Sequence, residues 1–169
     1  MNLAKHYAVQ NYVGRNLILD SNLLLLLWCA QLDRKLVDTF KRLNGFALPD
    51  VQLLEQLLPL FRSIHTTPHV LTEVSNLANS LPDWRKQDWA QFFSGKVLTL
   101  HEKWIQADVI VKDNKEAMPL GLTDAALVNL SGSYVILTAD RKLAVEIEKR
   151  GLAVINFNHI RDWLCNDRS

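Results

Sequence analysis

Cysteine is scarce in this chain, which contains two, Cys29 and Cys165, without CxxC spacing. A disulfide framework or a cysteine-based zinc site is therefore not expected, and both thiols should be reduced, as in a cytoplasmic protein. The chain also lacks internal repeats, low-complexity tracts and a linker rich in glycine and serine. With 169 residues, it is long enough for one domain with a sizeable core.

Long hydrophobic runs are missing as well. The run from Leu23 to Ala30 is far shorter than the roughly 20 residues that span a membrane, so a buried helix is expected there. The first residues lack the uninterrupted apolar core of a signal peptide. Nothing directs the protein out of the cytoplasm, and no membrane partner is expected.

Charge of one sign is not in excess, because the net charge is +1. This balance neither requires nor excludes a nucleic-acid partner, whose basic contact surface would have to be local. The sequence has neither a P-loop nor a GxSxG motif, so an NTPase or a serine hydrolase is not expected. His65 and His69 have a zinc-like spacing, but Pro68 argues against a shared helix and no third ligand is evident.

Short apolar strands alternate with helices along the chain. Strands are expected at 17–19, 96–100, 134–138 and 152–157. Helices are expected after Asp20 and at 33–44, 51–61, 69–81, 82–93, 102–114, 121–130 and 141–150. The strands are continuously apolar, as in a parallel sheet that is covered on both faces. The sequence therefore predicts an α/β fold with three layers, α/β/α, around a central, mostly parallel, twisted sheet.

Four carboxylates stand out by their context. Asp20 and Asp140 each follow an apolar strand directly, at the position where functional groups of open parallel sheets collect. Glu73 lies among apolar residues in the first turns of a helix, and Asp124 lies at a helix start. Each acid alone is explained by helix capping or by the helix dipole. Together, four crowded carboxylates need a cation, and oxygen ligands favour Mg²⁺ or Mn²⁺ over zinc.

Small polar residues mark the starts of the helices that carry two of these acids. Ser21 or Asn22 can cap the helix that follows Asp20. Thr123 can cap the helix that contains Asp124. The sequence leaves the choice between Ser21 and Asn22 open.

The four acids lie in the motifs ILDSNLLLLL, LTEVSNLA, GLTDAALVNLS and LTADRKLAVEIEKRGLAVINF. In order, and over nearly the whole chain, these resemble the four acidic motifs of the PIN domain, and most of all those of small bacterial VapC-like toxin ribonucleases. Each motif is short, and the order of all four makes the resemblance specific. The resemblance implies a single PIN-like domain over residues 1–169 and a Mg²⁺- or Mn²⁺-dependent endoribonuclease that hydrolyses RNA phosphodiester bonds.

The same resemblance implies roles for individual residues. The catalytic and metal-binding positions are Asp20, Glu73, Asp124 and Asp140. The positions of small polar groups that orient ligands and phosphate are Ser21, Asn22 and Thr138. Because Asp20 and Glu73 are further apart than in the most compact toxins, a helical insertion is expected around 45–66.

Basic residues near these acids are candidates for RNA contact. Arg141 and Lys142, which directly follow Asp140, are the first candidates. Further candidates beyond the Asp20 helix are Arg34, Lys35, Lys41 and Arg42. A solvated helix face is the simpler explanation for this second group, and phosphate contact is the functional alternative.

The sequence therefore predicts an RNA-cleaving toxin that is restrained by a protein antitoxin or regulatory partner, and a homodimer is compatible with the resemblance. Two alternatives stay open: a PIN nuclease that acts on DNA or structured RNA in defence or processing, and a PIN-like module that binds RNA or protein without cleavage. The presence of all four acids argues against the non-catalytic module. An aromatic cluster predicts core packing or, alternatively, a dimer or partner surface; its members are Trp84, Trp89, Phe92 and Phe93.

Overall fold

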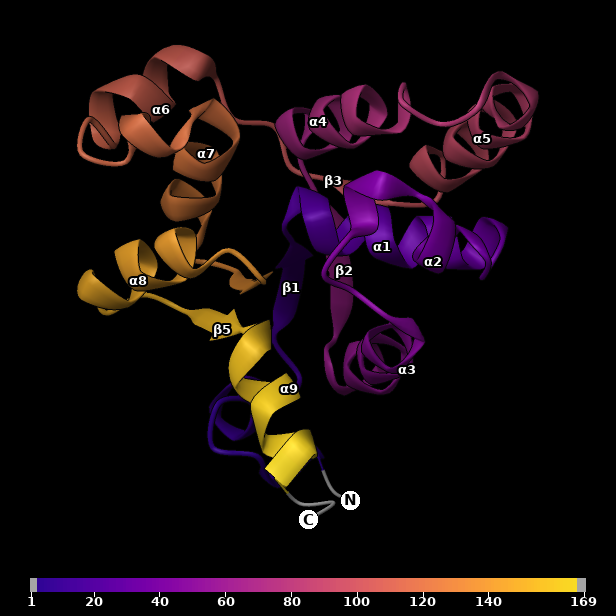
Figure 1. Ribbon diagram of the computed structural model, residues 1–169. Coiled ribbons are helices and arrows are strands. Elements are labelled where there is room, and N and C mark those ends of the chain that lie inside the picture. Colours follow the sequence, from indigo (N-terminus) through magenta and orange to yellow (C-terminus); the bar gives the residue numbers. More distant parts are fainter. Residues whose placement is uncertain (1–2, 167–169) are drawn as a thin grey trace.

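Five parallel strands form one sheet at the centre of the computed structural model, which describes residues 3–166 and side chains through residue 163 (Figure 1). The strands are β1 (Asn16–Leu19), β2 (Ser63–Thr66), β3 (His101–Glu102), β4 (Val135–Thr138) and β5 (Val154–Asn156). Their order across the sheet is β3-β2-β1-β4-β5. From β1 the chain winds to β2 and β3 on one side, and β4 and β5 complete the other side. The direction of winding therefore reverses between β1 and β4. Such a reversal creates a crevice beyond the carboxyl ends of these two strands.

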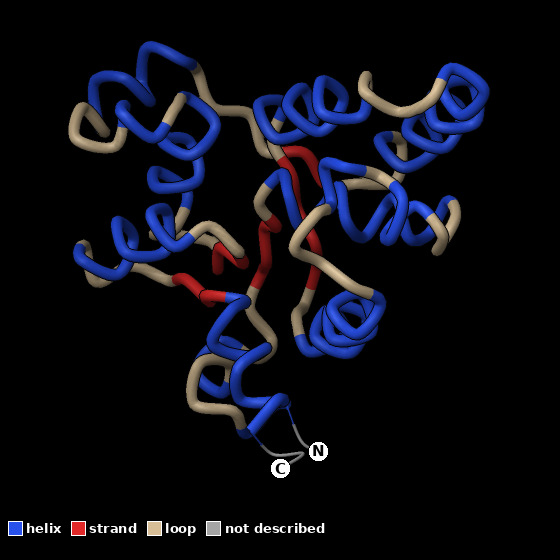
Figure 2. Tube along the Cα trace, in the orientation of Figure 1, coloured by secondary structure: helices blue, strands red, loops and turns tan. Residues whose placement is uncertain are grey.

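Helices flank this sheet and form the outer layers (Figure 2). The described α-helices are α1 (Ser21–Leu32), α2 (Leu36–Thr39), α3 (Leu48–Leu57), α4 (Pro68–Ala78), α5 (Asp83–Val97), α6 (Ala107–Asp113), α7 (Leu122–Leu130), α8 (Arg141–Lys149) and α9 (Phe157–Asn166). Short 3₁₀ turns, η1 to η5, lie at Leu3–Lys5, Gln10–Tyr12, Lys41–Leu43, Leu58–Leu60 and Met118–Leu120. The expected α/β class, with helical layers around a parallel sheet, is confirmed.

The two central strands and helix α1 form the core. Leu17, Ile18 and Leu19 of β1 are buried, as is every residue of β4. Helix α1 packs against β1, β4, α3, α4 and α5, so apolar residues are needed around the whole helix and not on one face alone. Burial on all sides explains why the sequences of these elements show no alternation between apolar and polar residues.

Strand β2 lies at the end of the segment around 45–66, for which a helical insertion was expected. Helix α3 and turn η4 occupy the first part of this segment, but Ser63–Thr66 form a strand next to β1, with Asn16 opposite Ser63. This strand was not predicted because most of its residues are polar. Ser63 donates a hydrogen bond to Oδ1 of Asn16 at 2.8 Å, and His65 follows on the same half-buried face. A strand on such a face needs no apolar side chains there.

The expected strand at 96–100 is wrong. Helix α5 continues to Val97, and strand β3 is limited to His101–Glu102 at the edge of the sheet, beside β2. Val97 and Leu100 are half-buried and pack on the core from a helix end and the following turn. Their apolar character therefore reflects packing of a helix end, not membership of a strand.

Two expected helices also have different limits. The helix expected at 102–114 starts later, because Gln106 is the N-cap of α6, and Trp104 lies in the connection between β3 and α6. The helix expected at 33–44 is divided into α2 and η3, between which Phe40 is extended with φ −88° and ψ 111°. Phe40 is buried in this conformation, so packing of its ring on the core accompanies the break.

The last expected strand, at 152–157, is shorter than predicted and is followed by a helix that was not expected. Phe157 is fully buried and begins α9. Arg161 of this helix binds the carboxylate of Asp50 in α3, with Nε at 2.8 Å from Oδ1. This ion pair fixes the C-terminal helix to the segment between β1 and β2.

Candidate active site at the carboxyl edge of the sheet

Asp20 ends strand β1 and begins helix α1. Its backbone N–H donates to the carbonyl of Leu137 at 2.9 Å, which extends the pairing with β4. Its Oδ1 accepts the backbone N–H of Leu23 at 2.7 Å, so Asp20 is itself the N-cap of the helix. The expectation that Ser21 or Asn22 caps this helix is therefore wrong, because the preceding carboxylate already fills that role.

The second oxygen of Asp20 is held by residues at the end of β4. Oδ2 accepts the hydroxyl hydrogen of Thr138 and, at 3.0 Å, the backbone N–H of Ala139. The Asp20 residue is only 3% exposed. Burial raises the pKa of its carboxyl group, hydrogen bonds oppose this rise, and the negative charge of Asp140 adds to it.

Asp140 occupies the equivalent position after β4. It is the N-cap of α8, and its Oδ1 accepts the backbone N–H groups of Lys142 at 2.6 Å and Leu143 at 3.2 Å. Its own backbone N–H donates to the hydroxyl oxygen of Thr138 at 2.9 Å. Since β1 pairs directly with β4, Asp20 and Asp140 flank the point where the winding of the sheet reverses.

Glu73 reaches the same edge from helix α4. This helix packs on α1, and the hydroxyl of Ser21 donates a hydrogen bond to Oε2 of Glu73 at 3.0 Å. Ser21 is buried, whereas its neighbour Asn22 is exposed. Of the two adjacent polar residues, Ser21 is therefore the one that holds an acidic side chain in place.

Asp124 is near enough to the other three acids for their charges to affect its pKa. It lies in the first turn of α7, whose N-cap is Gly121 with φ 109° and not the expected Thr123. Burial raises the pKa of Asp124 to about 7. The negative charges of the other three acids add to this rise, in the order Asp140, Glu73, Asp20. Four separate elements therefore bring their carboxylates toward one crevice.

Helix capping alone does not explain this arrangement. Asp20 and Asp140 are caps, and each could be purely structural on that ground. Glu73, however, lies within α4, beyond its first turn. Asp124 has a raised pKa, whereas a helix N-terminus favours the charged carboxylate and would lower the pKa. Burial is the main cause of the raised pKa, and the charges of the three other acids add to it.

The donor chemistry of the crevice suits a hard divalent cation. Carboxylate oxygens are the ligands that Mg²⁺ and Mn²⁺ prefer, and a cation would relieve the repulsion that acts on Asp124. Within the described residues, no three His, Cys, Asp or Glu side chains form a ready-made metal site. An ion would therefore draw the carboxylates together or bind through few of them and several waters, as Mg²⁺ commonly does.

The basic candidates fall into two separate places. Arg141 and Lys142 are exposed in the first turn of α8, directly beside Asp140. Arg34 and Lys35 follow the opposite end of α1, roughly 20 Å from Asp20, since a helix rises about 1.5 Å per residue. Arg34 is also paired with a glutamate of α3 at 3.0 Å. Only the first pair lies close to the acids.

A pocket of about 880 Å³ also lies at that distant end of α1. Lys35, Lys41 and Arg42 line it, together with Trp84. The positions of these cations are therefore remote from the crevice. A contact between them and RNA would involve a part of the strand far from the acids.

The aromatic cluster is divided between core and surface. Trp89 is buried and packs against Trp28, with ring centroids 6.5 Å apart, and the half-buried rings of Phe92 and Phe93 surround the same pair. Core packing is confirmed for these rings. Trp84 is 71% exposed, with an arginine guanidinium 4.5 Å from its ring centroid. It is the member of the cluster that is accessible to a partner.

Among the described residues, cysteine and histidine do not form a zinc site at this edge. Cys29 is buried in α1, and burial raises the pKa of its thiol to about 12. The side chain of Cys165 lies outside the described residues. His65 is in β2 and His69 is in the first turn of α4, so one helix does not carry both. In the described part of the chain, no helix is long and apolar enough to cross a bilayer.

A pocket of about 360 Å³ lies beside the acids and was not expected. Glu73 and Trp104 both line it. The periodicity of 102–114 predicts a helical Trp104 without a functional role. The signal that identifies this residue is its position just after β3, because Asp20 and Asp140 likewise follow the carboxyl ends of parallel strands.

Comparison of the chain with known proteins gives no match. Protein-family models, curated proteins and solved structures were all compared, and none of them matches. The resemblance to the PIN domain therefore rests on the four motifs and on the arrangement of their acids. Membership of that family is a proposal.

Proposed function

We propose that this chain is a PIN-type endoribonuclease that depends on Mg²⁺ or Mn²⁺ and hydrolyses phosphodiester bonds of RNA. The observation that carries the proposal is the convergence of four carboxylates on one crevice, which contributes to a pKa of about 7 at Asp124. Crowded like charges reduce stability, and such a cost is characteristic of functional sites. The order of the four motifs adds independent support.

When bound, a divalent ion supplies an activated water and neutralises charge on the phosphate. The residues that would hold it are Asp20, Asp124 and Asp140. Glu73 would bind a second ion or orient the attacking water. Thr138 holds Asp20 and Ser21 holds Glu73, so two of the carboxylates are fixed before substrate arrives.

The surroundings of the crevice suit a phosphate backbone. Helices α1, α4 and α8 begin just after the carboxyl ends of β1, β2 and β4, and the first turn of α7 carries Asp124. The positive ends of their dipoles favour anions. Arg141 and Lys142 add two exposed cations at the start of α8. These groups would attract and orient the RNA strand, while the acids act on one phosphate.

In this proposal the protein is a cytoplasmic toxin that a protein antitoxin or regulatory partner restrains, and it is able to form a homodimer. Growth arrest on expression, relieved by Asp20→Asn, would support the toxin. Cleavage of DNA alone would favour a nuclease of defence or processing. Binding of RNA without cleavage would favour a non-catalytic module.

The direct test compares two substitutions of helix-start aspartates. Asp124→Asn keeps the shape of the side chain but removes its charge, so cleavage of single-stranded RNA should fall roughly a hundredfold or more. Asp108→Asn is the control, because Asp108 lies in the first turn of α6 with its side chain 58% exposed. The control should cleave as the wild type does.

Chelation completes this test. EDTA should stop cleavage by the wild type, and Mg²⁺ or Mn²⁺ should restore it. Cleavage by Asp124→Asn at the wild-type rate would show that this acid is not part of the catalytic site. Cleavage that persists in EDTA would show that the chemistry does not need a divalent ion.

A further inference from the structure

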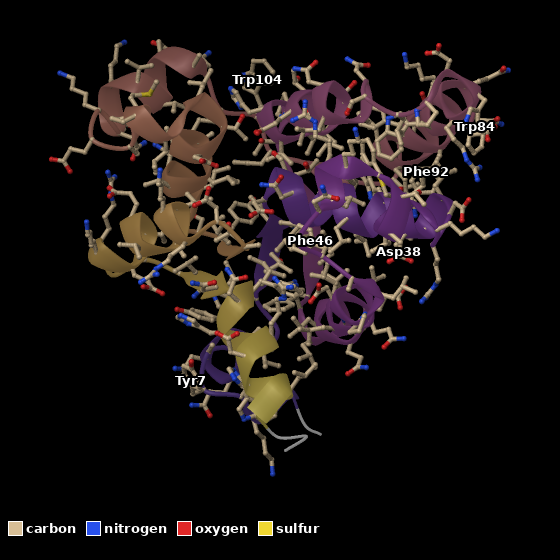
Figure 3. The ribbon with its side chains drawn as sticks, viewed as in Figure 1. Tyr7, Asp38, Phe46, Trp84, Phe92 and Trp104 are labelled. Carbon is tan, nitrogen blue, oxygen red and sulfur yellow. The ribbon has the colours of Figure 1, made fainter. Side chains whose placement is uncertain are left out.

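Trp104 forms one wall of the pocket of about 360 Å³ beside Glu73. It comes from the loop between β3 and α6, whereas the facing walls come from α4 and from the first turn of α7. Figure 3 shows Trp104 at the end of the molecule where α4 and α7 approach each other. Polar residues of the lining include Thr72 and Asn76 from α4 and Thr123 from α7.

The indole ring of Trp104 is available for stacking. Trp104 is 66% exposed. Trp84, the other strongly exposed tryptophan, has the guanidinium of Arg85 4.5 Å from its ring centroid. Among the described residues, no comparable aromatic or cationic partner lies over the ring of Trp104. A large flat ring without a partner, on the wall of a pocket, is a suitable surface for another flat group.

The pocket shares Glu73 with the proposed catalytic site. Glu73 belongs to both, since it lines the pocket and its charge acts on Asp124. Thr123 lines the pocket and immediately precedes Asp124 in the first turn of α7. A group that fills the pocket therefore lies directly next to a phosphate held by the acids. In an RNA strand, the neighbouring group is a base.

We propose that this pocket binds the base of an unpaired ribonucleotide next to the scissile phosphate, with Trp104 as the stacking platform. The inference rests on the proposed nuclease function and specifies its substrate as single-stranded RNA. A base that is paired within a duplex is stacked on its neighbours and cannot lie on a protein ring. The pocket volume is near the lower end of the range for small-ligand sites, which suits one base.

The polar lining gives this pocket a means of distinguishing bases. Asn76 carries an amide that both donates and accepts, and Thr72 carries a hydroxyl on the same helix. These groups can bind the edge of a base while the indole contacts its face. Trp104 thus supplies affinity that is independent of sequence, and Asn76 supplies a preference among bases.

The test measures binding without cleavage. In the Asp124→Asn background, a fluorescein-labelled single-stranded oligoribonucleotide of mixed sequence stays intact, and its anisotropy reports affinity. Adding Trp104→Ala should weaken binding roughly 5- to 100-fold, the range expected for loss of one stacked base. The affinity of Trp104→Phe should lie between the affinities of the background and of Trp104→Ala, because a smaller ring still stacks on the base.

Tyr7→Ala is the matched control. Tyr7 is 65% exposed, almost the same as Trp104, and lies at the opposite end of the molecule (Figure 3). This variant should bind as the background does. Binding of a fully paired RNA duplex should not respond to Trp104→Ala. Equal affinity of Trp104→Ala and the background would overturn the proposal, as would an equal loss for duplex and single strand.

The outcomes separate this proposal from the nuclease proposal. If the wild type cleaves RNA but Trp104→Ala binds like its background, the base pocket is wrong and the nuclease stands. If the wild type cleaves no RNA but Trp104→Ala still loses single-strand affinity selectively, the nuclease is wrong and the base pocket stands.

Discussion

Thr138 joins the two aspartates at the carboxyl edge of the sheet: its hydroxyl donates to the buried carboxylate of Asp20 and accepts the backbone N–H of Asp140 at 2.9 Å. The hydroxyl is fully buried at the end of β4, next to β1. Both of its hydrogen bonds are therefore shielded from water. The Thr138 hydroxyl therefore links the positions of both aspartates.

Thr138→Val should remove the bridge and keep the shape of the side chain. The free energy of unfolding should fall by about 1–3 kcal/mol, because a buried oxygen loses its donor. RNA cleavage should fall roughly 10- to 100-fold, because Asp20 is no longer held. Urea denaturation and cleavage assays check both values. Thr99→Val, at an exposed hydroxyl bonded to its local backbone, should change neither. Wild-type stability and activity of Thr138→Val would exclude the bridge from the mechanism.

Burial of Asp124, together with repulsion from the other three acids, should make the metal-free protein less stable as pH rises. The folded pKa is about 7, whereas an unfolded aspartate has a pKa of about 3.9. The folded state thus holds this proton more tightly. Its stabilising contribution is complete below about pH 4 and is lost as pH rises through about 7.

Melting temperatures in EDTA measure this effect. Between about pH 5 and pH 8, the wild type should lose more stability than Asp124→Asn does, because only the wild type gains the crowded charge. At the upper pH the variant should be the more stable protein, although it cleaves RNA poorly. Parallel pH profiles for the two proteins would mean that Asp124 does not carry the proposed charge.

Ser21 and Asn22, which the sequence does not distinguish, should differ in effect. Ser21→Ala removes the donor to Glu73 at 3.0 Å and should lower the cleavage rate by about 10-fold or more. Asn22→Ala removes an exposed side chain and should have the smaller effect. Steady-state cleavage rates decide between them. A larger loss in Asn22→Ala would assign the orienting role to the exposed amide.

The ion pair between Arg161 and Asp50 should stabilise the fold without affecting catalysis. Asp50 also accepts the backbone N–H of Ala47 at 2.8 Å, and its side chain is only 9% exposed. Arg161→Ala should lower the free energy of unfolding by about 2–3 kcal/mol, because a largely buried carboxylate loses a charged donor. Arg34→Ala breaks an ion pair with Glu55 whose side chains are 53% and 40% exposed. This variant should lower the free energy of unfolding by less than about 1 kcal/mol. Equal losses in the two variants would contradict this difference.

The sequence predicts the central part of the sheet because its strands are apolar and end at acids. β1 and β4 are buried on both faces, and a continuous run of leucine, isoleucine and valine predicts such a strand. Asp20 and Asp140 then follow from the rule that functional groups lie beyond the carboxyl ends of parallel strands. This reasoning predicts both their place and their proximity.

The edges of the fold are not predicted in the same way. β2 lines a half-buried face with Ser63 and His65, and Ile64 is its one apolar residue, so its apolar signal is weak. The apolar residues at 96–100 pack from a helix end, which periodicity does not distinguish from a strand. The wrong prediction for Trp104 follows from that error. With a strand expected at 96–100, the next helix is expected from 102, and Trp104 is assigned to it instead of to the loop after β3. The base pocket is therefore visible only in the folded chain.

The most direct test of the central claim is a calorimetric titration of Mn²⁺ into the metal-free protein at about pH 8, above the pKa of about 7 at Asp124. The account predicts saturable binding to the wild type and to Asp108→Asn, and binding at least roughly tenfold weaker in Asp140→Asn. Absence of Mn²⁺ binding to the wild type, or equal binding by all three proteins, would contradict a cation site formed by these four acids.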